Sequence, residues 1–572
     1  MRRIVLGLVA AALALGVAFA ALLARGSESG FERAVLERLH TGAGLRLDAR
    51  GTAVGLLPAP RLRLTDVTVR APDGAELARA RSLTATPRLA PLLFGRVELE
   101  TVALDGVVAT VTDADLDAFA DALRGWILVG ARPPTLRVTD GELVWGHARI
   151  RGIDLGLAWP RGGALGLTAA GRFRGRPVEA TATLDDPTAV ALGRSGAVRA
   201  RFEGGGVRLA YDGHTTTDGA SARIDGRIAA RADSIRDVAR WFGAPLPAVG
   251  PELSGATLSG AAAVSRAGVA VDQAEIAVDG ANYVGAARFA LSDAGRPQIE
   301  ATLDARTLDV TPYLDGLAPA FGADGSWSGV RFDVQPFQAV DLDLRLSARS
   351  VRAGGLRLGP TAATVTVADG ALDVGVGEAQ VYGGVVAGRA RIRPDGRANH
   401  VWLDLQARGV DLEDLLTAAR GEAALSGAFS VEASLTGSGG SMEEIVSSLS
   451  GEGAARLQDG VMGGFRAKAL VLLGLGGRLE IRSIDGAMTM AGGVARLREL
   501  ALVGPAARVD VAGEADLRTR RFDLGGRLAA GNGASAPVRI DGPFDDPRLR
   551  LDSRSSFGRG GDAGATEAAV AP

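Results

Sequence analysis

The stretch Val365-Thr366-Val367-Ala368-Asp369-Gly370-Ala371-Leu372-Asp373-Val374 contains the pattern that decides the fold. Two short apolar runs flank Asp-Gly, a dipeptide that supplies the positive φ angles of a tight hairpin turn. The stretch therefore predicts a strand, a turn and a second strand. Asp-Gly recurs along the chain, and we expect turns at those positions as well: Asp105-Gly106, Asp140-Gly141, Asp225-Gly226, Asp395-Gly396, Asp459-Gly460 and Asp485-Gly486. Such short, even spacing predicts a mainly antiparallel sheet.

Apolar and polar residues alternate with period two on both sides of this stretch. Asp341, Asp343 and Arg345 separate apolar residues in 340–346, and similar alternation appears in 401–406 and 538–540. A strand with this period has one apolar face and one polar face. The apolar positions of these runs are Val340, Leu342, Leu344, Leu346, Val401, Leu403, Leu405, Val538 and Ile540.

A few segments have helical rather than strand periodicity. Apolar residues recur at helical spacing in 113–129, 232–242 and 411–419, and a capping box at residues 441–444 predicts a short helix ending near 449. We also expect helices at 31–39 and at 465–475, although an apolar strand is an alternative for the second segment. The sequence thus predicts a mostly β fold with a few short helices.

The first 25 residues predict a membrane anchor. Met1-Arg2-Arg3 precedes an unbroken apolar run of 21 residues, 4–24, which ends at Arg25. At about 1.5 Å per residue a helix of this length spans roughly 30 Å, the thickness of a bilayer's hydrocarbon core. The leading arginines predict a cytoplasmic N-terminus. The alternative is a cleaved signal peptide with Ala18-Phe19-Ala20 as its cleavage site, which would also export the chain.

Composition and motifs argue against several functional classes. With 64 basic and 66 acidic residues, the chain has no global basic field for binding nucleic acid. Cysteine is absent, which excludes thiol nucleophiles and zinc–thiolate sites, and four scattered histidines lack metal-ligand spacing. Residues 113–117 are rich in Asp but lack the ligand pattern of an EF-hand. We therefore expect a protein that is not an enzyme and that uses no metal or cofactor.

The apolar face of the predicted sheet has two interpretations. It can be a closed core in which two sheet layers bury each other. It can also be an open trough that holds acyl chains. The alternation of residues fits both interpretations, and taken alone it favours the closed core.

The order of motifs in the C-terminal half resembles the AsmA family. Residues 412–416 lead to 424–431 and 435–439, followed by the capped segment 442–449, by 457–461 and finally by 538–549. Val381-Tyr382-Gly383-Gly384 and Ser483-Ile484-Asp485-Gly486 also fit the family. The resemblance covers about residues 300–552, and the N-terminal run fits the start of the family less specifically.

This resemblance implies an inner-membrane protein of Gram-negative bacteria that is single-pass and has its bulk in the periplasm. It implies a long, curved sheet, open as a trough, that binds phospholipid and passes it toward the outer membrane in support of outer-membrane biogenesis. The nine apolar residues named above would then line a lipid groove. Phospholipid and the inner membrane are the implied partners, together with outer-membrane or periplasmic assembly partners, and nucleic acid is not one.

Two other classes of protein compete with this interpretation. One is a structural or regulatory periplasmic scaffold for outer-membrane assembly with a closed core. The other is an exported β-solenoid enzyme acting on envelope polysaccharide, which would need clustered acids and aromatic residues that the sequence does not show. We expect five regions: the anchor (1–25), an AsmA-like N-terminal β region (26–190), a middle β region (191–330), an AsmA-like C-terminal β region (331–552) and a disordered tail (553–572).

Overall fold

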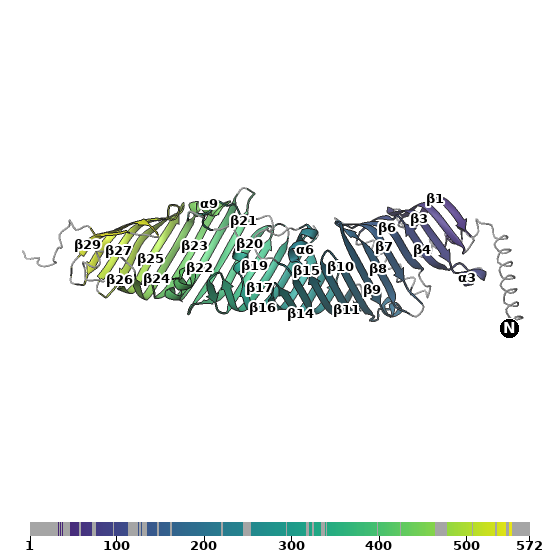
Figure 1. Cartoon of the computed structure of the whole chain (residues 1–572), viewed down its shortest axis with the longest axis horizontal. Coiled ribbons are helices and arrows are strands. Elements are labelled where there is room, and N and C mark those ends of the chain that lie inside the picture. The colour runs from purple at the N-terminus through teal and green to yellow at the C-terminus, as the bar shows by residue number, and fades with distance from the viewer. Residues whose placement is uncertain are drawn as a thin grey trace, which may run out of the picture. The chain divides into compact units, whose positions relative to one another are not determined.

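The computed structural model describes residues 46–551 with gaps, the longest at 113–123, 128–133, 244–252 and 464–477, and also residues 32, 33, 35 and 37. Thirty β-strands in the described residues are assigned to one mainly antiparallel sheet, and the helices are few and short. The chain divides into two compact units: residues 1–243 with 254–274, and residues 244–253 with 275–572. The predicted mostly β fold is confirmed, and each unit is described by itself (Figure 1).

In the described residues of unit 1, thirteen complete strands and three short helices are named. The strands are β1 (Arg46–Gly55), β2 (Arg61–Arg70), β3 (Glu76–Pro87), β4 (Leu99–Asp105), β5 (Val108–Val111), β6 (Thr135–Trp145), β7 (Ala148–Ala158), β8 (Leu165–Phe173), β9 (Arg176–Leu184), β10 (Ala197–Gly204), β11 (Val207–Asp218), β12 (Ser221–Ala232) and β13 (Ala256–Ser265). The helices are α3 (Leu89–Leu93), α5 (Pro187–Ala191) and α6 (Ile235–Phe242). The division between the units falls within β14 (Gly268–Val278).

The described part of unit 2 has sixteen complete strands and three short helices. The strands are β15 (Ala281–Leu291), β16 (Pro297–Asp309), β17 (Asp341–Ala353), β18 (Leu356–Leu358), β19 (Thr361–Ala368), β20 (Ala371–Val381), β21 (Gly384–Pro394), β22 (Asn399–Asp411), β23 (Ala428–Gly439), β24 (Ser450–Gly463), β25 (Arg478–Ala491), β26 (Val494–Val503), β27 (Ala507–Asp516), β28 (Arg521–Ala530), β29 (Ser535–Pro543) and β30 (Arg548–Leu551). The helices are α7 (Thr311–Asp315), α8 (Leu412–Arg420) and α9 (Met442–Ser448).

The hairpin predicted at Asp369-Gly370 is present. Ala368 of β19 pairs with Ala371 of β20, and both intervening residues have positive φ, 50° and 76°. Positive φ at both central residues matches the right-handed twist of the flanking strands, as hairpin turns require.

The turn prediction was wrong at four other Asp-Gly dipeptides, which lie inside strands. Asp140-Gly141 is in β6, Asp225-Gly226 in β12, Asp459-Gly460 in β24 and Asp485-Gly486 in β25. Glycine has a different purpose at these places. A Cβ on Gly226 would lie 2.3 Å from the Asp212 carbonyl oxygen of the neighbouring strand, so a close backbone approach needs glycine there.

Side-chain caps explain where the predicted helices of unit 2 begin. The Asp411 carboxylate accepts a hydrogen bond from the Asp414 amide and opens α8, and the Ser441 hydroxyl accepts one from the Glu444 amide and opens α9. The glutamate of this capping box also accepts a hydrogen bond from the Gly440 amide at 2.6 Å. Figure 1 shows α9 at one edge of the unit 2 strands.

The other predicted helices are only partly described. In unit 1, α6 matches the prediction for 232–242 and is capped by Ser234. Arg124 and Ile127 are helical within 113–129, and residues 32, 33, 35 and 37 are helical within 31–39. The remainder of both segments, the segment 465–475 and the predicted anchor lie outside the described residues. Among the residues that are described, no helix is both long and apolar enough to span a membrane.

Three parallel pairings interrupt the antiparallel order. In unit 1, β4 and β5 run parallel to β6, and in unit 2, β16 runs parallel to β17. Parallel neighbours require a long crossover connection, and the connections here are long: residues 112–134 join β5 to β6, and residues 310–340 join β16 to β17.

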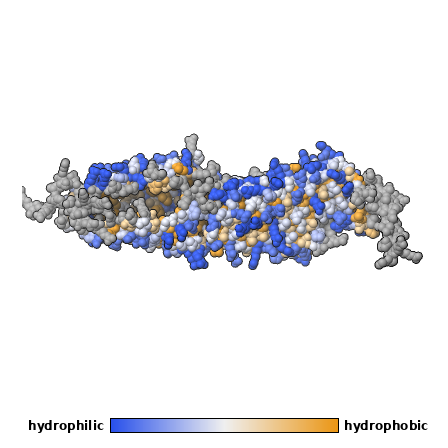
Figure 2. Space-filling model, in the orientation of Figure 1, coloured by the Kyte–Doolittle hydropathy of each residue, from blue (hydrophilic) through white to orange (hydrophobic). Residues whose placement is uncertain are grey.

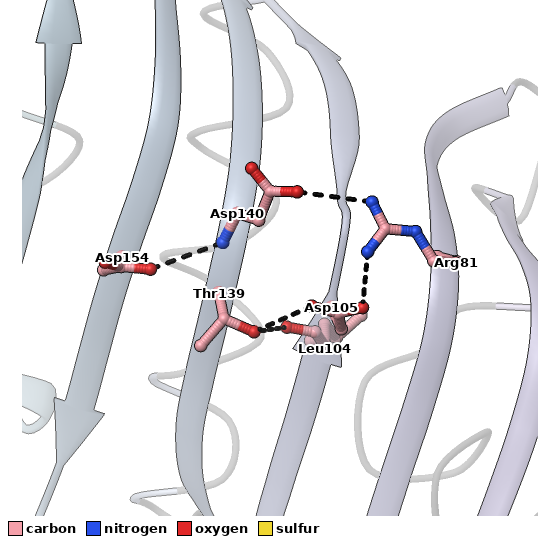
Figure 3. A network of polar contacts seen from close by, with 6 residues as sticks. All are labelled: Arg81, Leu104, Asp105, Thr139, Asp140 and Asp154. Carbon is pink, nitrogen blue, oxygen red and sulfur yellow. Dashed lines mark hydrogen bonds and ion pairs between the residues drawn. The ribbon is translucent and has the colours of Figure 1, made fainter.

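Polar side chains bind the strands of unit 1 together at the first of these crossovers. The Arg81 guanidinium donates to Asp105 at 2.9 Å and to Asp140 at 3.2 Å, joining β3, β4 and β6 (Figure 3). The Thr139 hydroxyl donates to Asp105, and the Asp140 amide donates to Asp154 on β7. These side chains are exposed, and water weakens each ion pair to about 0–1 kcal/mol.

Candidate functional site

The apolar residues predicted on β17 and β22 lie in common rows across unit 2. Strand register connects Leu344 to Leu403 through Val365, Val374 and Ala390, one residue on each intervening strand. Residues that pair directly in a sheet present their side chains on the same side. These five side chains therefore share one face of the sheet, which we call the apolar face.

Two parallel rows flank this one. Leu346 connects through Ala363, Val376 and Gly388 to Leu405. Leu342 connects through Val367, Leu372 and Ile392 to Val401 by the same four pairings. Val340 lies directly before β17 and is half-buried.

The predicted residues of β29 belong to the same face. Register carries the row of Leu405 to Ile540 through Ala433, Gly453, Met488, Leu497, Gly513 and Leu524. Val538 lies in the neighbouring row. That row begins at Ala407 and reaches Val538 through Val431, Ala455, Gly486, Leu500, Val511 and Gly526. The structure thus places the predicted residues of β17, β22 and β29 on one side of the sheet.

Most of the apolar face from β17 to β22 is only half-buried. Leu342, Leu344, Leu346 and Leu405 have intermediate exposure, and Leu403 is 38% exposed. All strands belong to one sheet, so no separate sheet covers these residues in the described part of unit 2. Figure 2 shows hydrophobic residues inside a hollow of unit 2, with hydrophilic residues along its rims.

Two hollows follow the row that contains Leu346 and Leu405. Leu303, Leu346, Ala363 and Val376 are among the residues that line a cavity of about 490 Å³. Further along the row, Leu405, Ala433, Gly453 and Met488 are among those lining a cavity of about 650 Å³. Small residues leave space for these hollows. Gly388, Ala433 and Gly453 have little or no side chain to fill the space above the sheet.

Near the C-terminal end of unit 2, the apolar face is buried by the packing of its own side chains. Val511, Leu524 and Val538 form a buried cluster, in which Val538 is 3% exposed, and Ile540 packs against it. Phe522 and Phe544 pack with their ring centroids 4.4 Å apart beside a second cluster around Met490. The apolar face is therefore accessible at β17 and β22 and self-buried at β27 to β29.

The opposite face carries charged side chains in cross-strand pairs. Asp373 accepts hydrogen bonds from Arg389 at 2.9 Å and from Arg391 at 2.7 Å, and Glu514 pairs with Arg496 at 3.1 Å. Burial alone would raise the pKa of Asp373, but the hydrogen bonds from both arginines outweigh it and hold the pKa below its ordinary value. The Arg456 guanidinium likewise lowers the pKa of Asp485. The sheet of unit 2 therefore has two chemically distinct sides. One side carries charged pairs, and the other carries the apolar rows.

Unit 1 has an apolar face of its own. Register connects Ala169 to Leu258 through Ala180, Phe202, Leu209 and Ala230. Phe202, Leu209, Ala230 and Leu258 are among the residues lining a cavity of about 650 Å³. At β2 to β4 the apolar face is instead fully buried, and Val35 of the N-terminal helical segment packs into that cluster.

Sequence reasoning missed the residues on β19 to β21 that connect the predicted leucines. Val365, Val374 and Ala390 complete the row between Leu344 and Leu403. Period-two alternation was present in residues 361–367 and 372–376, so the signal existed. The register that aligns the strands was needed to turn these separate runs into continuous rows.

The described residues offer little for metal chemistry. No cluster of three or more His, Asp or Glu side chains among them is placed to hold a metal ion. His400 lies 3.0 Å from Asp395 at an exposed turn of β21 and β22, and this pair is part of the polar surface.

Comparison with known proteins identifies the family. The model of the AsmA family matches residues 244–488. An AsmA family protein of Escherichia coli (strain K12), YhjG, is 22% identical over 541 residues, which cover 87% of this chain and 75% of that protein. The chain belongs to the AsmA family. The part of the apolar rows that runs from β17 to β24 lies within the matched residues. No solved structure matches this AsmA family chain.

Proposed function

We propose that this AsmA family protein binds phospholipid acyl chains on the apolar face and passes them along it. The observation that carries the proposal is the continuous row from Leu344 to Leu403, which is apolar on every strand and half-exposed. Each CH₂ group moved from water to an apolar surface gains about 0.8 kcal/mol. An acyl chain could move from strand to strand without a catalytic group, while its polar headgroup stayed in solvent.

Cellular location is part of the proposal. The 21-residue apolar run at 4–24 would anchor the chain in the inner membrane with its N-terminus in the cytoplasm and its bulk in the periplasm. Lipid carried from that membrane would support outer-membrane biogenesis. Membership of the AsmA family supports this location and role.

A scaffold with a closed core remains the second candidate, and one observation favours it. At Val511, Leu524 and Val538 the apolar face is already buried by its own side chains, as in an ordinary core. If the whole face behaved in this way, it would stabilise the protein and would be closed to lipid. The two candidates therefore differ in what a charge at an exposed row position would do.

Leu403 and Trp402 provide a matched test of these candidates. They are neighbours on opposite faces of β22 and are almost equally exposed, at 38% and 37%. A charge among acyl chains is costly, so we expect Leu403→Asp to deplete the phospholipid that co-purifies with the full chain, and Leu344→Asp to do the same. Trp402→Asp should leave the lipid content unchanged. Mass spectrometry of extracted lipids measures both.

Thermal unfolding of the same variants separates a loss of lipid from a loss of fold. On the transport proposal Leu403→Asp keeps a cooperative transition close to that of Trp402→Asp, because the site is open to water. In a closed core the same substitution would destabilise the protein by several kcal/mol. Unfolding of Leu403→Asp, with no phospholipid found in the unsubstituted protein, would establish the scaffold instead.

A further inference from the structure

The loop between β3 and β4 exposes apolar side chains that the lipid rows do not explain. Phe94 is 83% exposed, the highest value among the large hydrophobic residues that the structure describes, and Leu89 is 49% exposed. Both belong to the segment that contains α3, and Figure 1 shows α3 beside the first strands of unit 1. Exposed large hydrophobic side chains of this kind mark interaction sites when they gather in one place.

Backbone hydrogen bonds hold the tip of this loop in a defined shape. The Arg88 amide donates to the Glu98 carbonyl at 2.7 Å and closes the base of the loop. The Phe94 and Arg96 amides both donate to the Pro91 carbonyl at 3.0 Å. Phe94 is thus presented to solvent by an ordered turn, so little conformational entropy would be lost on binding.

The charges around the tip favour an anionic lipid surface as the partner. Residues 88–96 read Arg-Leu-Ala-Pro-Leu-Leu-Phe-Gly-Arg and contain two arginines and no acidic residue. Aromatic and aliphatic side chains flanked by basic residues suit the boundary between headgroups and acyl chains. Each arginine near an anionic leaflet adds electrostatic attraction to it.

The position of the loop in the chain brings it close to the predicted anchor. Val35 is buried in one cluster with Leu83 of β3 and Leu99 of β4, the two strands that α3 connects. Residues 25–34 lie between Val35 and Ala24, the end of the apolar run, and this connection can span at most about 40 Å. A membrane that held residues 4–24 would therefore lie within about 40 Å of Val35, which packs on the two strands that flank α3.

We propose that the α3 tip, residues 88–96, inserts Phe94 and Leu89 into the interface of the membrane that holds residues 4–24. This proposal rests on the membrane attachment in the proposed function and does not depend on lipid transport. Insertion would give the protein a second membrane contact beside the anchor and would fix the first strands of unit 1 at the lipid surface.

The absence of cysteine from the chain allows a clean test. Phe94→Cys in the full chain, labelled with an environment-sensitive fluorophore, is reconstituted in protein-free vesicles of phosphatidylcholine and phosphatidylglycerol. Leu291→Cys is the matched control, because Leu291 is 70% exposed at the end of β15 in unit 2. We expect blue-shifted emission at position 94, quenched by nitroxide-labelled lipid, and water-like emission at position 291.

The outcomes separate this proposal from the proposed function. If the protein floats with the vesicles but the emission at position 94 remains water-like, tip insertion is overturned and the anchor is not. Failure of the protein to float with vesicles would overturn both the attachment and the tip contact. Because the vesicles contain no other protein, a blue shift cannot come from a protein partner. Arg88→Gln with Arg96→Gln should weaken the shift in vesicles that contain phosphatidylglycerol.

Discussion

At the residue scale, glycine sets how closely neighbouring strands approach on the apolar face. A Cβ on Gly526 of β28 would lie 1.9 Å from the Asp510 carbonyl oxygen of β27. Gly525, the next residue along the same strand, has nothing within 4 Å of the equivalent position. The two glycines therefore have different structural roles although they are adjacent.

These two glycines give the first prediction. Gly526→Ala should lower the free energy of unfolding by about 1–3 kcal/mol, because the added methyl group forces β27 and β28 apart. Gly525→Ala should be neutral or stabilising by about 0.5–1 kcal/mol, because alanine loses less backbone entropy than glycine. Chemical denaturation measures both. Equal effects of the two substitutions would show that the strand spacing at Gly526 is not as described.

Asp516 gives a prediction about acid stability. The Arg518 guanidinium donates to Asp516 at 2.9 Å and, with the Arg518 and Thr519 amides, lowers the pKa of Asp516 to about 2. A depressed carboxyl pKa stabilises the fold above the unfolded pKa of about 3.9 and loses this contribution as pH falls through about 2. Asp516→Asn should therefore reduce stability at pH 7 and have a smaller effect below pH 2.

A double-substitution cycle isolates this interaction. In an Arg518→Gln background, Asp516→Asn should cost less at pH 7 than it does in the original chain. Thermal unfolding followed at both pH values measures the difference. An unchanged cost in that background, or a cost that persists unchanged below pH 2, would exclude the ion pair as its cause.

At the element scale, the crossover between β16 and β17 is tied to a distant turn of unit 2. Trp327 donates from its indole Nε1 to the Leu517 carbonyl at 2.7 Å and stacks on Phe321 with ring centroids 4.6 Å apart. The Phe332 amide donates to Gly440 beside α9. The crossover therefore follows the sheet edge that carries α9 and the turn between β27 and β28.

Loss of the Trp327 hydrogen bond should loosen this crossover. Trp327→Phe preserves an aromatic ring for the stack but leaves the Leu517 carbonyl without its donor, which should cost about 0.5–1.5 kcal/mol. Hydrogen exchange should become faster in residues 325–332. Trp159→Phe is the matched control, because Trp159 donates only to the nearby Gly163 carbonyl at 3.0 Å in unit 1. If hydrogen exchange in residues 325–332 were similar in both variants, the Trp327 hydrogen bond would not be what holds the crossover in place.

Local chemistry explains which elements the sequence predicted well. The helices α6, α8 and α9 begin at Ser234, Asp411 and Ser441, side chains that satisfy free amides within a few residues. The crossover was not predicted, because Trp327 and Leu517 are 190 residues apart and no local pattern connects them. Asp-Gly failed as a turn signal inside β6, β12, β24 and β25 because close strand approach and bulges also require glycine.

At the scale of the whole molecule, alternation predicted which side chains share a face, and the register of unit 2 bears this out for Leu344 and Leu403. Alternation could not predict access to that face, because the same pattern produces open Leu403 and buried Val538. Whether an apolar residue is covered depends on tertiary packing, which the period of a single strand does not contain.

The most direct test of acyl-chain binding is photocrosslinking in cells on the two faces of β22. A photoreactive residue at position 403 should capture phospholipid, as should one at position 344, because both lie in the half-exposed apolar row. Crosslinkers at positions 402, 404 and 343, on the polar face, should capture none. Phospholipid captured equally from both faces, or from neither in a folded protein, would contradict the account.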